Sequence, residues 1–193
     1  MGAAPVLKLS VEEYLALDRA AEIPNEYYDG EIFPIEDATL QHGFIGANAI
    51  RHISERLDGT LGRVATPVRV RVSPTKFVYP DLLVTCGKPA VADAKADTVL
   101  NPKVIVEILS PTTEDYNYGR KFLLYQLLPS FEEYVLIAQD EPRVSVYRKV
   151  PDDLWILATY RGLQSVAKLA SLGIELPLAE LYDGVEWTSS PST

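Results

Sequence analysis

The sequence has 193 residues and is 47% hydrophobic, which is enough for one domain with a sizeable core. Its single cysteine, Cys86, excludes an intrachain disulfide and a cysteine-based zinc site, and no apolar run approaches the roughly 20 residues of a membrane span. The net charge of −9 disfavours nucleic-acid binding unless basic residues gather locally. We expect a cytoplasmic single domain over residues 1–193, with a core at about residues 8–183, short flexible tails and Cys86 buried.

The N-terminal part of the sequence predicts a helix, a hairpin and a second helix. Ser10-Val11-Glu12-Glu13 has the pattern of a capping box and opens a short helix that reaches about Arg19. Residues 26–33 favour strand structure with a turn at Asp29-Gly30. Apolar residues recur every four positions over residues 42–57, which indicates a helix, and His52 within it is expected at the surface.

The remainder of the sequence is mostly of β type. Residues 63–72 alternate, so that Val68, Val70 and Val72 share one face and Arg69 and Arg71 the other. Residues 103–109 are nearly all apolar, which is typical of a central strand covered on both faces. We expect further strands at 77–86, 133–138, 143–149 and 155–160, a helix at 116–128 stopped by Pro129, and a short amphipathic segment at 178–182. This order predicts an α/β (α+β) fold with a mixed central sheet flanked by helices.

Three charged residues occupy positions where charge is costly. Glu107 lies within the apolar strand 103–109, and an ionised carboxylate is rarely buried without a partner. Asp81 follows Pro80 directly before Leu82-Leu83-Val84, and Lys121 shares a helical stripe with Leu124, Tyr125 and Leu128. Taken singly, these residues also suit a buried ion pair, a turn and a lysine that extends to solvent. If the three side chains meet, they form one site.

A site of this composition suits phosphodiester hydrolysis. Two carboxylates from neighbouring strands provide oxygen ligands for Mg²⁺ or Mn²⁺. Such an ion binds a phosphate oxygen and lowers the pKa of a bound water. A nearby lysine can orient or deprotonate that water, or neutralise the developing charge.

Several motifs together resemble those of a known family. They are Leu9-Ser10-Val11-Glu12-Glu13-Tyr14, Glu26-Tyr27-Tyr28-Asp29-Gly30-Glu31, Pro80-Asp81, the run from Val106 to Thr113, Gly119-Arg120-Lys121 with Tyr125, the run from Glu132 to Ile137, and Ile174-Glu175-Leu176-Pro177-Leu178. The combination resembles the Uma-two family, also called domain of unknown function 820, which is placed in the PD-(D/E)XK restriction-endonuclease-like superfamily. The resemblance covers most of the chain and implies a nuclease of that fold.

The resemblance also implies roles for individual residues. Asp81 matches the aspartate of the superfamily motif, and Glu107 matches its second acidic residue. The superfamily lysine usually comes two residues later, where this sequence has Leu109. Lys121 matches a displaced lysine on the following helix. Glu26 matches an N-terminal acidic residue that can be a further metal ligand, directly or through water.

Five residues are candidates for substrate contact: His42, Arg69, Arg71, Asn117 and Tyr125. His42 could contact a phosphate or simply pack at a helix start. Arg69 and Arg71 could form a local basic patch or a solvated strand face. The family commonly has aspartate where this chain has Asn117, which removes one charge next to the predicted site.

We therefore interpret the chain as a Mg²⁺- or Mn²⁺-dependent DNA endonuclease, in which Asp81 and Glu107 bind the ion and Lys121 acts on water. A homodimer or higher oligomer would suit cleavage of both strands. An alternative is a catalytically weak or inactive nuclease-fold module that acts in binding or assembly, which the net acidity and Asn117 favour. A third hypothesis is an enzyme for RNA or another phosphodiester.

Overall fold

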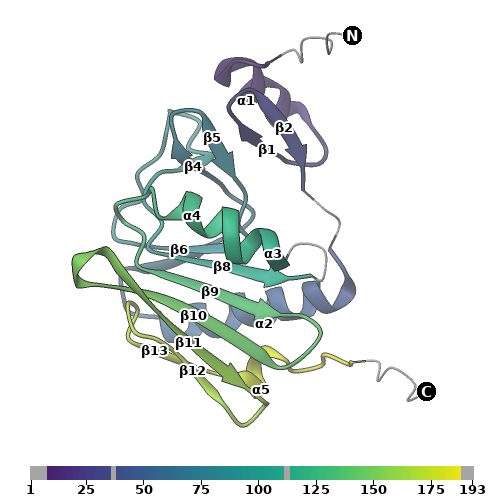
Figure 1. The fold of residues 1–193 in the computed structure, drawn as a ribbon, viewed down its shortest axis with the longest axis vertical. Helices are drawn as coiled ribbons and strands as arrows, with labels where there is room; N and C mark the ends of the chain where they lie inside the picture. The colour runs from purple at the N-terminus through teal and green to yellow at the C-terminus, as the bar shows by residue number, and fades with distance from the viewer. Residues whose placement is uncertain (1–7, 36–37, 111–113, 188–193) are drawn as a thin grey trace.

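The computed structural model describes residues 8–35, 38–110 and 114–187 and has a mixed α+β architecture (Figure 1). The helical elements are α1 (Val11–Ala20), α2 (Leu40–Arg56), α3 (Glu114–Tyr116), a π-helical turn η1 (Asn117–Lys121), α4 (Phe122–Tyr125), a 3₁₀ turn η2 (Pro151–Asp153) and α5 (Leu178–Leu181). Among the helices of the described residues, none combines the length and apolar character that a membrane crossing requires. Residues 1–7 and 188–193 of the predicted tails and residues 111–113 of the run from Val106 to Thr113 lie outside the described residues.

The strands form two mixed sheets and a separate hairpin. Sheet A has the order β2-β1-β5-β4-β7, with β1 (Asn25–Tyr28), β2 (Glu31–Pro34), β4 (Arg69–Ser73), β5 (Lys76–Val78) and β7 (Thr98–Val99). Sheet B has the order β11-β10-β9-β8-β6-β3, with β3 (Gly62–Ala65), β6 (Leu82–Cys86), β8 (Val104–Leu109), β9 (Glu133–Ala138), β10 (Arg143–Val150) and β11 (Leu154–Arg161). The hairpin pairs β12 (Val166–Leu169) with β13 (Ile174–Pro177).

Sheet B carries the main core on both faces. Strand β8 is buried at all six positions and runs parallel to β9, with the α3–η1–α4 segment as the crossover between them. Val104, Val106 and Ile108 pack on the side of α2, whereas Ile105 and Leu109 pack on the side of α4. The predicted central strand is thus confirmed. Figure 1 shows α2 and α4 on opposite faces of this sheet.

Two expected strands are each divided between the sheets. Residues 63–72 form β3 in sheet B and β4 in sheet A, and residues 77–86 form β5 in sheet A and β6 in sheet B. The breaks contain Pro67 and Pro80, which cannot donate a ladder hydrogen bond. The expected mixed sheet flanked by helices is confirmed, and a second mixed sheet, which the sequence did not indicate, accompanies it. The crossing at Tyr79-Pro80-Asp81 brings Asp81 to the junction of the two sheets.

The structure also tests the predictions for the capping box, Cys86 and His52. The capping box is present, because Ser10 Oγ accepts from Glu13 N and Glu13 Oε2 accepts from Ser10 N. Cys86 is exposed, not buried, because it is the last residue of β6. His52 is buried, not at the surface, where its Nδ1 lies 3.2 Å from carboxylate oxygens of both Glu55 and Glu180.

An ionic contact ties α1 to the segment before β7. Arg19 Nε donates to Asp97 Oδ2 over 2.7 Å, and Arg19 Nη2 donates to Asp93 Oδ2 over 2.7 Å. The hydrogen bond from Arg19 lowers the pKa of Asp97 from 3.8 to about 2. A carboxyl whose pKa is lower in the folded state contributes stability above its ordinary pKa and loses it as the pH falls through the lowered value.

Replacing Arg19 with glutamine should therefore lower the free energy of unfolding most at neutral pH. The difference from the wild type should shrink as the pH falls below the ordinary 3.8 toward about 2, because Asp97 becomes protonated in both proteins. Urea unfolding at a series of pH values measures this. Lys168→Gln is the control, since that lysine is 67% exposed and lies 3.4 Å from Glu175. A pH-independent effect of Arg19→Gln would contradict the account.

Candidate active site

The candidate site lies where sheet A, sheet B and the η1 segment meet. Glu26 comes from β1 of sheet A, Glu107 from β8 of sheet B, and Asp81 from the crossing between β5 and β6. Lys121 ends the π-helical turn, and His42 lies in the first turn of α2. Residues that are far apart in the sequence are thereby brought to one place.

Lys121 joins the two buried glutamates. Its Nζ lies 2.9 Å from Glu107 Oε1 and 3.3 Å from Glu26 Oε1, and it donates to the Tyr79 carbonyl over 3.0 Å. The side chain is 8% exposed. Burial alone would lower the pKa of Lys121, but the charges of Glu107 and Glu26 raise it above its ordinary value. The ammonium is therefore charged at neutral pH.

The π-helical turn places this lysine. The structure divides the expected helix 116–128 into α3, η1 and α4, which end at Tyr125, before the expected Leu128. A π-helical turn inserts an extra residue into the helix and changes which side chains face the core, and such turns are frequent at functional sites. Lys121, Leu124, Tyr125 and Leu128 are all buried, as the predicted stripe required.

Glu107 is the most deeply buried acid of the site. Its Oε1 accepts a hydrogen bond of 2.7 Å from the Tyr125 hydroxyl. Burial raises the pKa of Glu107 to about 7; the charge of Lys121 opposes this rise, and the charge of Asp81 adds to it. Asp81 and Glu107 therefore lie close enough to repel each other.

Asp81 lies beside Glu107 and is accessible from solvent. Its Oδ2 accepts from the backbone N–H of Ile108, the residue after Glu107, over 2.6 Å. Its Oδ1 lies 3.1 Å from His42 Nε2, and the Asp81 side chain is 26% exposed. Burial would lower the pKa of His42, but the hydrogen bond and charge of Asp81 raise it. The His42–Asp81 pair thus forms the solvent-facing part of the site.

Glu26 is held by a set of tyrosines that the sequence analysis did not identify. Its Oε1 accepts from Tyr79 N over 3.1 Å, and its Oε2 accepts from the hydroxyls of Tyr28 and Tyr116, which also contact each other. Burial raises the pKa of Glu26, but Lys121 and these hydrogen bonds bring it below its ordinary value. The sequence does carry a signal for this set, because tyrosines accompany two motifs already noted. Tyr28 lies within Glu26-Tyr27-Tyr28-Asp29-Gly30-Glu31, and Tyr79 directly precedes Pro80-Asp81.

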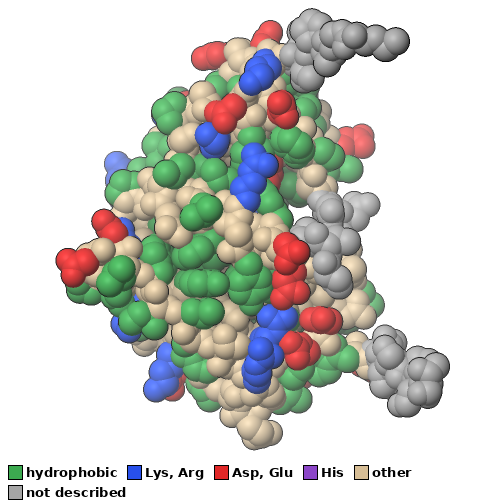
Figure 2. All heavy atoms as spheres, in the orientation of Figure 1, with side chains coloured by type: hydrophobic (Ala, Val, Ile, Leu, Met, Phe, Trp, Pro, Cys, Tyr) green, Lys and Arg blue, Asp and Glu red, His purple; other side chains and the backbone are tan. Residues whose placement is uncertain are grey.

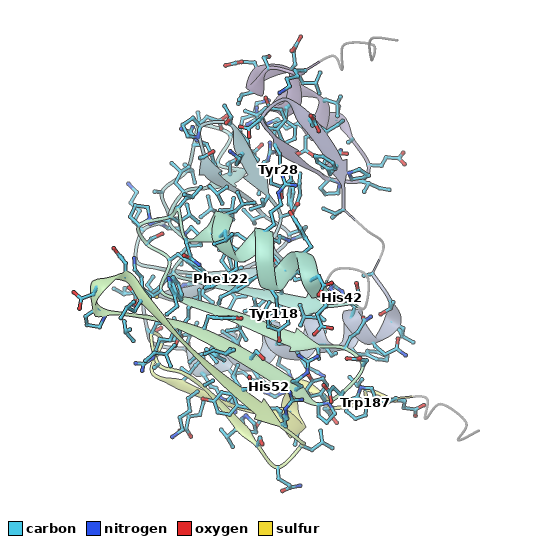
Figure 3. The ribbon with its side chains drawn as sticks, in the orientation of Figure 1. Tyr28, His42, His52, Tyr118, Phe122 and Trp187 are labelled. Atoms are coloured by element: carbon cyan, nitrogen blue, oxygen red, sulfur yellow. The ribbon has the colours of Figure 1, made fainter. Side chains whose placement is uncertain are left out.

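An open cavity of about 1080 Å³ leads to these residues. Tyr28 and His42, both labelled in Figure 3, line it from β1 and α2. Glu26, Asp81, Glu107, Asn117, Arg120 and Lys121 also line it. Asn117 is 4% exposed, and its buried Oδ1 has no hydrogen-bond partner among the described residues.

Arg69 and Arg71 do not line this cavity. Arg69 is 3% exposed, because α1 covers this face of sheet A, and its Nη2 lies 3.5 Å from both Asp18 and Asp97. Its guanidinium also lies over the rings of Tyr14 and Tyr79. The structure thus places Arg69 in a buried contact between α1 and sheet A. Arg120, which the sequence analysis did not single out, is the arginine that lines the cavity.

The Tyr125–Glu107 hydrogen bond can be tested through stability. Tyr125→Phe should lower the free energy of unfolding by about 1.5–3 kcal/mol, because the hydroxyl serves a buried charged acceptor. Tyr27→Phe is the matched control, since its hydroxyl donates to the neutral carbonyl of Leu9 over 2.7 Å. That change should cost about 1 kcal/mol. Equal losses in urea unfolding would contradict the assigned role of Tyr125.

Comparison with known proteins identifies the family of this chain. Residues 11–179 match the profile of the Uma2 family, which is described as "Putative restriction endonuclease". The chain belongs to the Uma2 family. The resemblance that the sequence motifs indicated is therefore confirmed.

Relatives and a solved structure support the family assignment and the fold. In Synechocystis sp. (strain ATCC 27184 / PCC 6803 / Kazusa), "Uncharacterized protein slr1290" is 30% identical over 94% of this chain and 95% of its own length. From the same organism, "Uncharacterized protein sll1609" is 31% identical over 80% and 88%. A putative nuclease belonging to DUF820 from Anabaena variabilis ATCC 29413 has a similar fold, with a TM-score of 0.74, 19% identity, and coverage of 90% of this chain and 97% of that one.

Proposed function

We propose that this Uma2 protein is a divalent-metal-dependent endonuclease that hydrolyses DNA phosphodiester bonds, acting as a single domain in the cytoplasm. The observation that carries the proposal is the meeting of Asp81, Glu107 and Lys121 at the cavity. Lys121 Nζ lies 2.9 Å from Glu107, and Asp81 binds the backbone of the residue next to Glu107. The family assignment supports a nuclease, and the side-chain chemistry supports phosphodiester hydrolysis.

The donor set fits Mg²⁺ or Mn²⁺. Among the described residues, no group of three or more His, Cys, Asp or Glu is arranged as a metal cage. Mg²⁺, however, commonly binds through one or two carboxylates and keeps several waters. Asp81 and Glu107 supply such a pair, and their mutual repulsion favours a cation between them. When bound, the ion neutralises phosphate charge and lowers the pKa of a bound water.

Within this proposal Glu26 positions Lys121 and is a further metal ligand, directly or through water. Its Oε1 faces the ammonium, and both its oxygens accept hydrogen bonds, as do both oxygens of Asp81. Lys121 stays protonated because its two carboxylate neighbours raise its pKa. Its role is then to orient the attacking water and to stabilise the developing charge on the phosphate, since a charged ammonium cannot accept a proton.

The groups that line the cavity are the candidates for substrate contact. His42 carries a raised pKa and can donate to a phosphate oxygen when protonated. Among the described residues Asn117 has a buried acceptor without a partner, and Arg120 is an exposed cation that lines the cavity. In this proposal Tyr125 holds Glu107 by a hydrogen bond, and Arg69 stabilises the fold through its contact with Asp18, so neither contacts the substrate. The contact set of this proposal is His42, Asn117 and Arg120.

A second candidate function is a nuclease-fold module that binds or assembles without catalysis. Lys121 already neutralises Glu107 and Glu26, and the chain has a net charge of −9. Calorimetry separates the two functions, because the module predicts no Mn²⁺ binding at the site.

The direct test of activity is cleavage of plasmid DNA by the purified protein with Mg²⁺ or Mn²⁺. Asp81→Ala and Lys121→Ala are prepared identically and assayed beside it, with RNA and small phosphodiesters as further substrates. Metal-dependent nicking by the wild type alone supports the proposal. Equal cleavage by all three proteins would assign the activity to a contaminant. If only RNA is cleaved, the substrate is RNA and not DNA.

A further inference from the structure

An unpaired edge of sheet B lies away from the candidate site. Strand β11 is the outermost strand on its side, and its described neighbour in the sheet is β10 alone. It is eight residues long, and Leu154, Ile156 and Leu157 are 62%, 51% and 48% exposed. From Leu154 to Tyr160 the strand has no charged residue. Proteins usually shorten, charge or cover such edges, because an apolar edge pairs with other strands.

The hydrogen bonds of β11 determine which of its backbone groups point outward. Gly162 N donates to the Pro142 carbonyl over 2.8 Å, in the register that continues the Arg143↔Arg161 pair. Hydrogen-bonded and non-bonded pairs alternate along an antiparallel ladder. The N–H and C=O groups of the even-numbered residues of β11 therefore point toward β10. The same groups of the odd-numbered residues Trp155, Leu157 and Thr159 point away from the sheet.

Side chains beside this edge extend the apolar surface. Leu157 pairs across the ladder with Tyr147, whose ring centroid lies 4.5 Å from that of Phe122 at the start of α4. Leu123 and Leu127, beside the same helix, are 64% and 55% exposed. Figure 2 shows hydrophobic side chains gathered over α4 and the neighbouring strands of sheet B, with charged side chains toward the margins.

We propose that β11 pairs antiparallel with β11 of a second copy of this chain, around a two-fold axis at Leu157. In this register Leu157 faces itself, Trp155 faces Thr159 of the second copy, and Ile156 faces Ala158 of the second copy. A two-fold interface uses the same patch twice and must be self-complementary. The apolar side chains on both faces of β11 meet this condition, and sheet B becomes continuous through both copies.

Charge complementarity favours this register. Asp153 lies in the turn η2 directly before the strand and has a positive φ, so it does not itself continue the strand pairing. Arg161 ends the strand, and the side chains of Asp153 and Arg161 are 87% and 65% exposed. With Leu157 on the axis, the Asp153 end of each copy lies beside the Arg161 end of the other, and a shift of two residues in either direction moves these opposite charges apart. Within the chain, Asp153 lies 2.7 Å from Lys149 and Arg161 lies 3.4 Å from Glu141.

Cross-linking tests the register. Residues of a hydrogen-bonded antiparallel pair have Cα atoms about 5.5 Å apart, within the range for a disulfide. The variant Leu157→Cys in a Cys86→Ser background should form a disulfide-linked dimer on mild oxidation. Leu61→Cys in the same background is the control, because Leu61 is 74% exposed beside the opposite edge strand β3. Equal or absent cross-linking of Leu157→Cys would overturn the register.

Sedimentation at micromolar concentration tests the interface itself. The wild type should sediment at twice the mass of 21.4 kDa that one chain has. Leu157→Lys should weaken association at least about tenfold, since it places two ammonium groups on the axis, while Leu61→Lys should not. A monomeric wild type, or a dimer that Leu157→Lys leaves intact, would contradict the proposal. Both substituted positions are exposed, so neither change should unfold the protein, and circular dichroism checks that each variant is folded.

Discussion

Replacing Lys121 with methionine is expected to reduce both phosphodiester cleavage and stability. Methionine keeps most of the length of the unbranched side chain but leaves Glu107 and Glu26 without their shared cation. Removing one partner of a buried ion pair costs about 3–5 kcal/mol, because the remaining charge stays buried. Loss of a group that stabilises developing charge lowers the cleavage rate by about 10²–10³-fold. Urea unfolding and plasmid cleavage measure the two effects.

Lys103→Met is the matched control for this substitution. Lys103 Nζ lies 3.2 Å from Glu132 Oε2, but the two side chains are 25% and 47% exposed. An exposed pair of this kind is worth less than about 1 kcal/mol. The control should keep its activity and nearly all its stability. If Lys121→Met has no larger effect than Lys103→Met, the buried triad is not a functional unit.

Asparagine at position 81 should abolish cleavage while leaving the fold nearly unchanged. The amide oxygen can still accept the hydrogen bond from Ile108 N, and the side chain is already 26% exposed. The charge that holds a metal ion is lost, so we expect Mn²⁺ affinity to fall at least about tenfold and cleavage about 10²–10³-fold. Calorimetry and plasmid cleavage measure these changes.

The contrast between the two substitutions is itself informative. Lys121→Met should change stability and activity together, whereas Asp81→Asn should change activity and metal affinity with little change in stability. Asp140→Asn, at an exposed position, is the control for loss of one carboxylate. Full activity in Asp81→Asn would remove Asp81 from the site.

The sequence predicted those parts of the fold that depend on local pattern. The capping box at Ser10, the hairpin at Asp29-Gly30, the buried strand β8 and the exact bounds of β9 all follow from residue type and periodicity. The division of residues 63–72 and 77–86 between two sheets could not be predicted in this way. Strand pairing is a long-range property, and an extended segment has the same alternation whether or not it changes sheet.

The site was predictable in its charged residues and not in its surroundings. Glu107 and Lys121 were found because charge at a core position requires a partner, and the structure brings them together. The sequence did not indicate the π-helical turn at Asn117–Lys121 or the tyrosines that hold Glu26. Arg69 was expected in a basic patch or on a solvated face and is in neither, since strand alternation contains no information about the helix α1 that covers it.

The central claim is that Asp81 and Glu107 hold a divalent cation beside Lys121. Anomalous scattering from crystals soaked in Mn²⁺ tests it most directly. We predict a peak at the carboxylates of Asp81 and Glu107, with the Lys121 ammonium still bound to Glu107. A map with no peak at these carboxylates in Mn²⁺-saturated crystals would contradict the account.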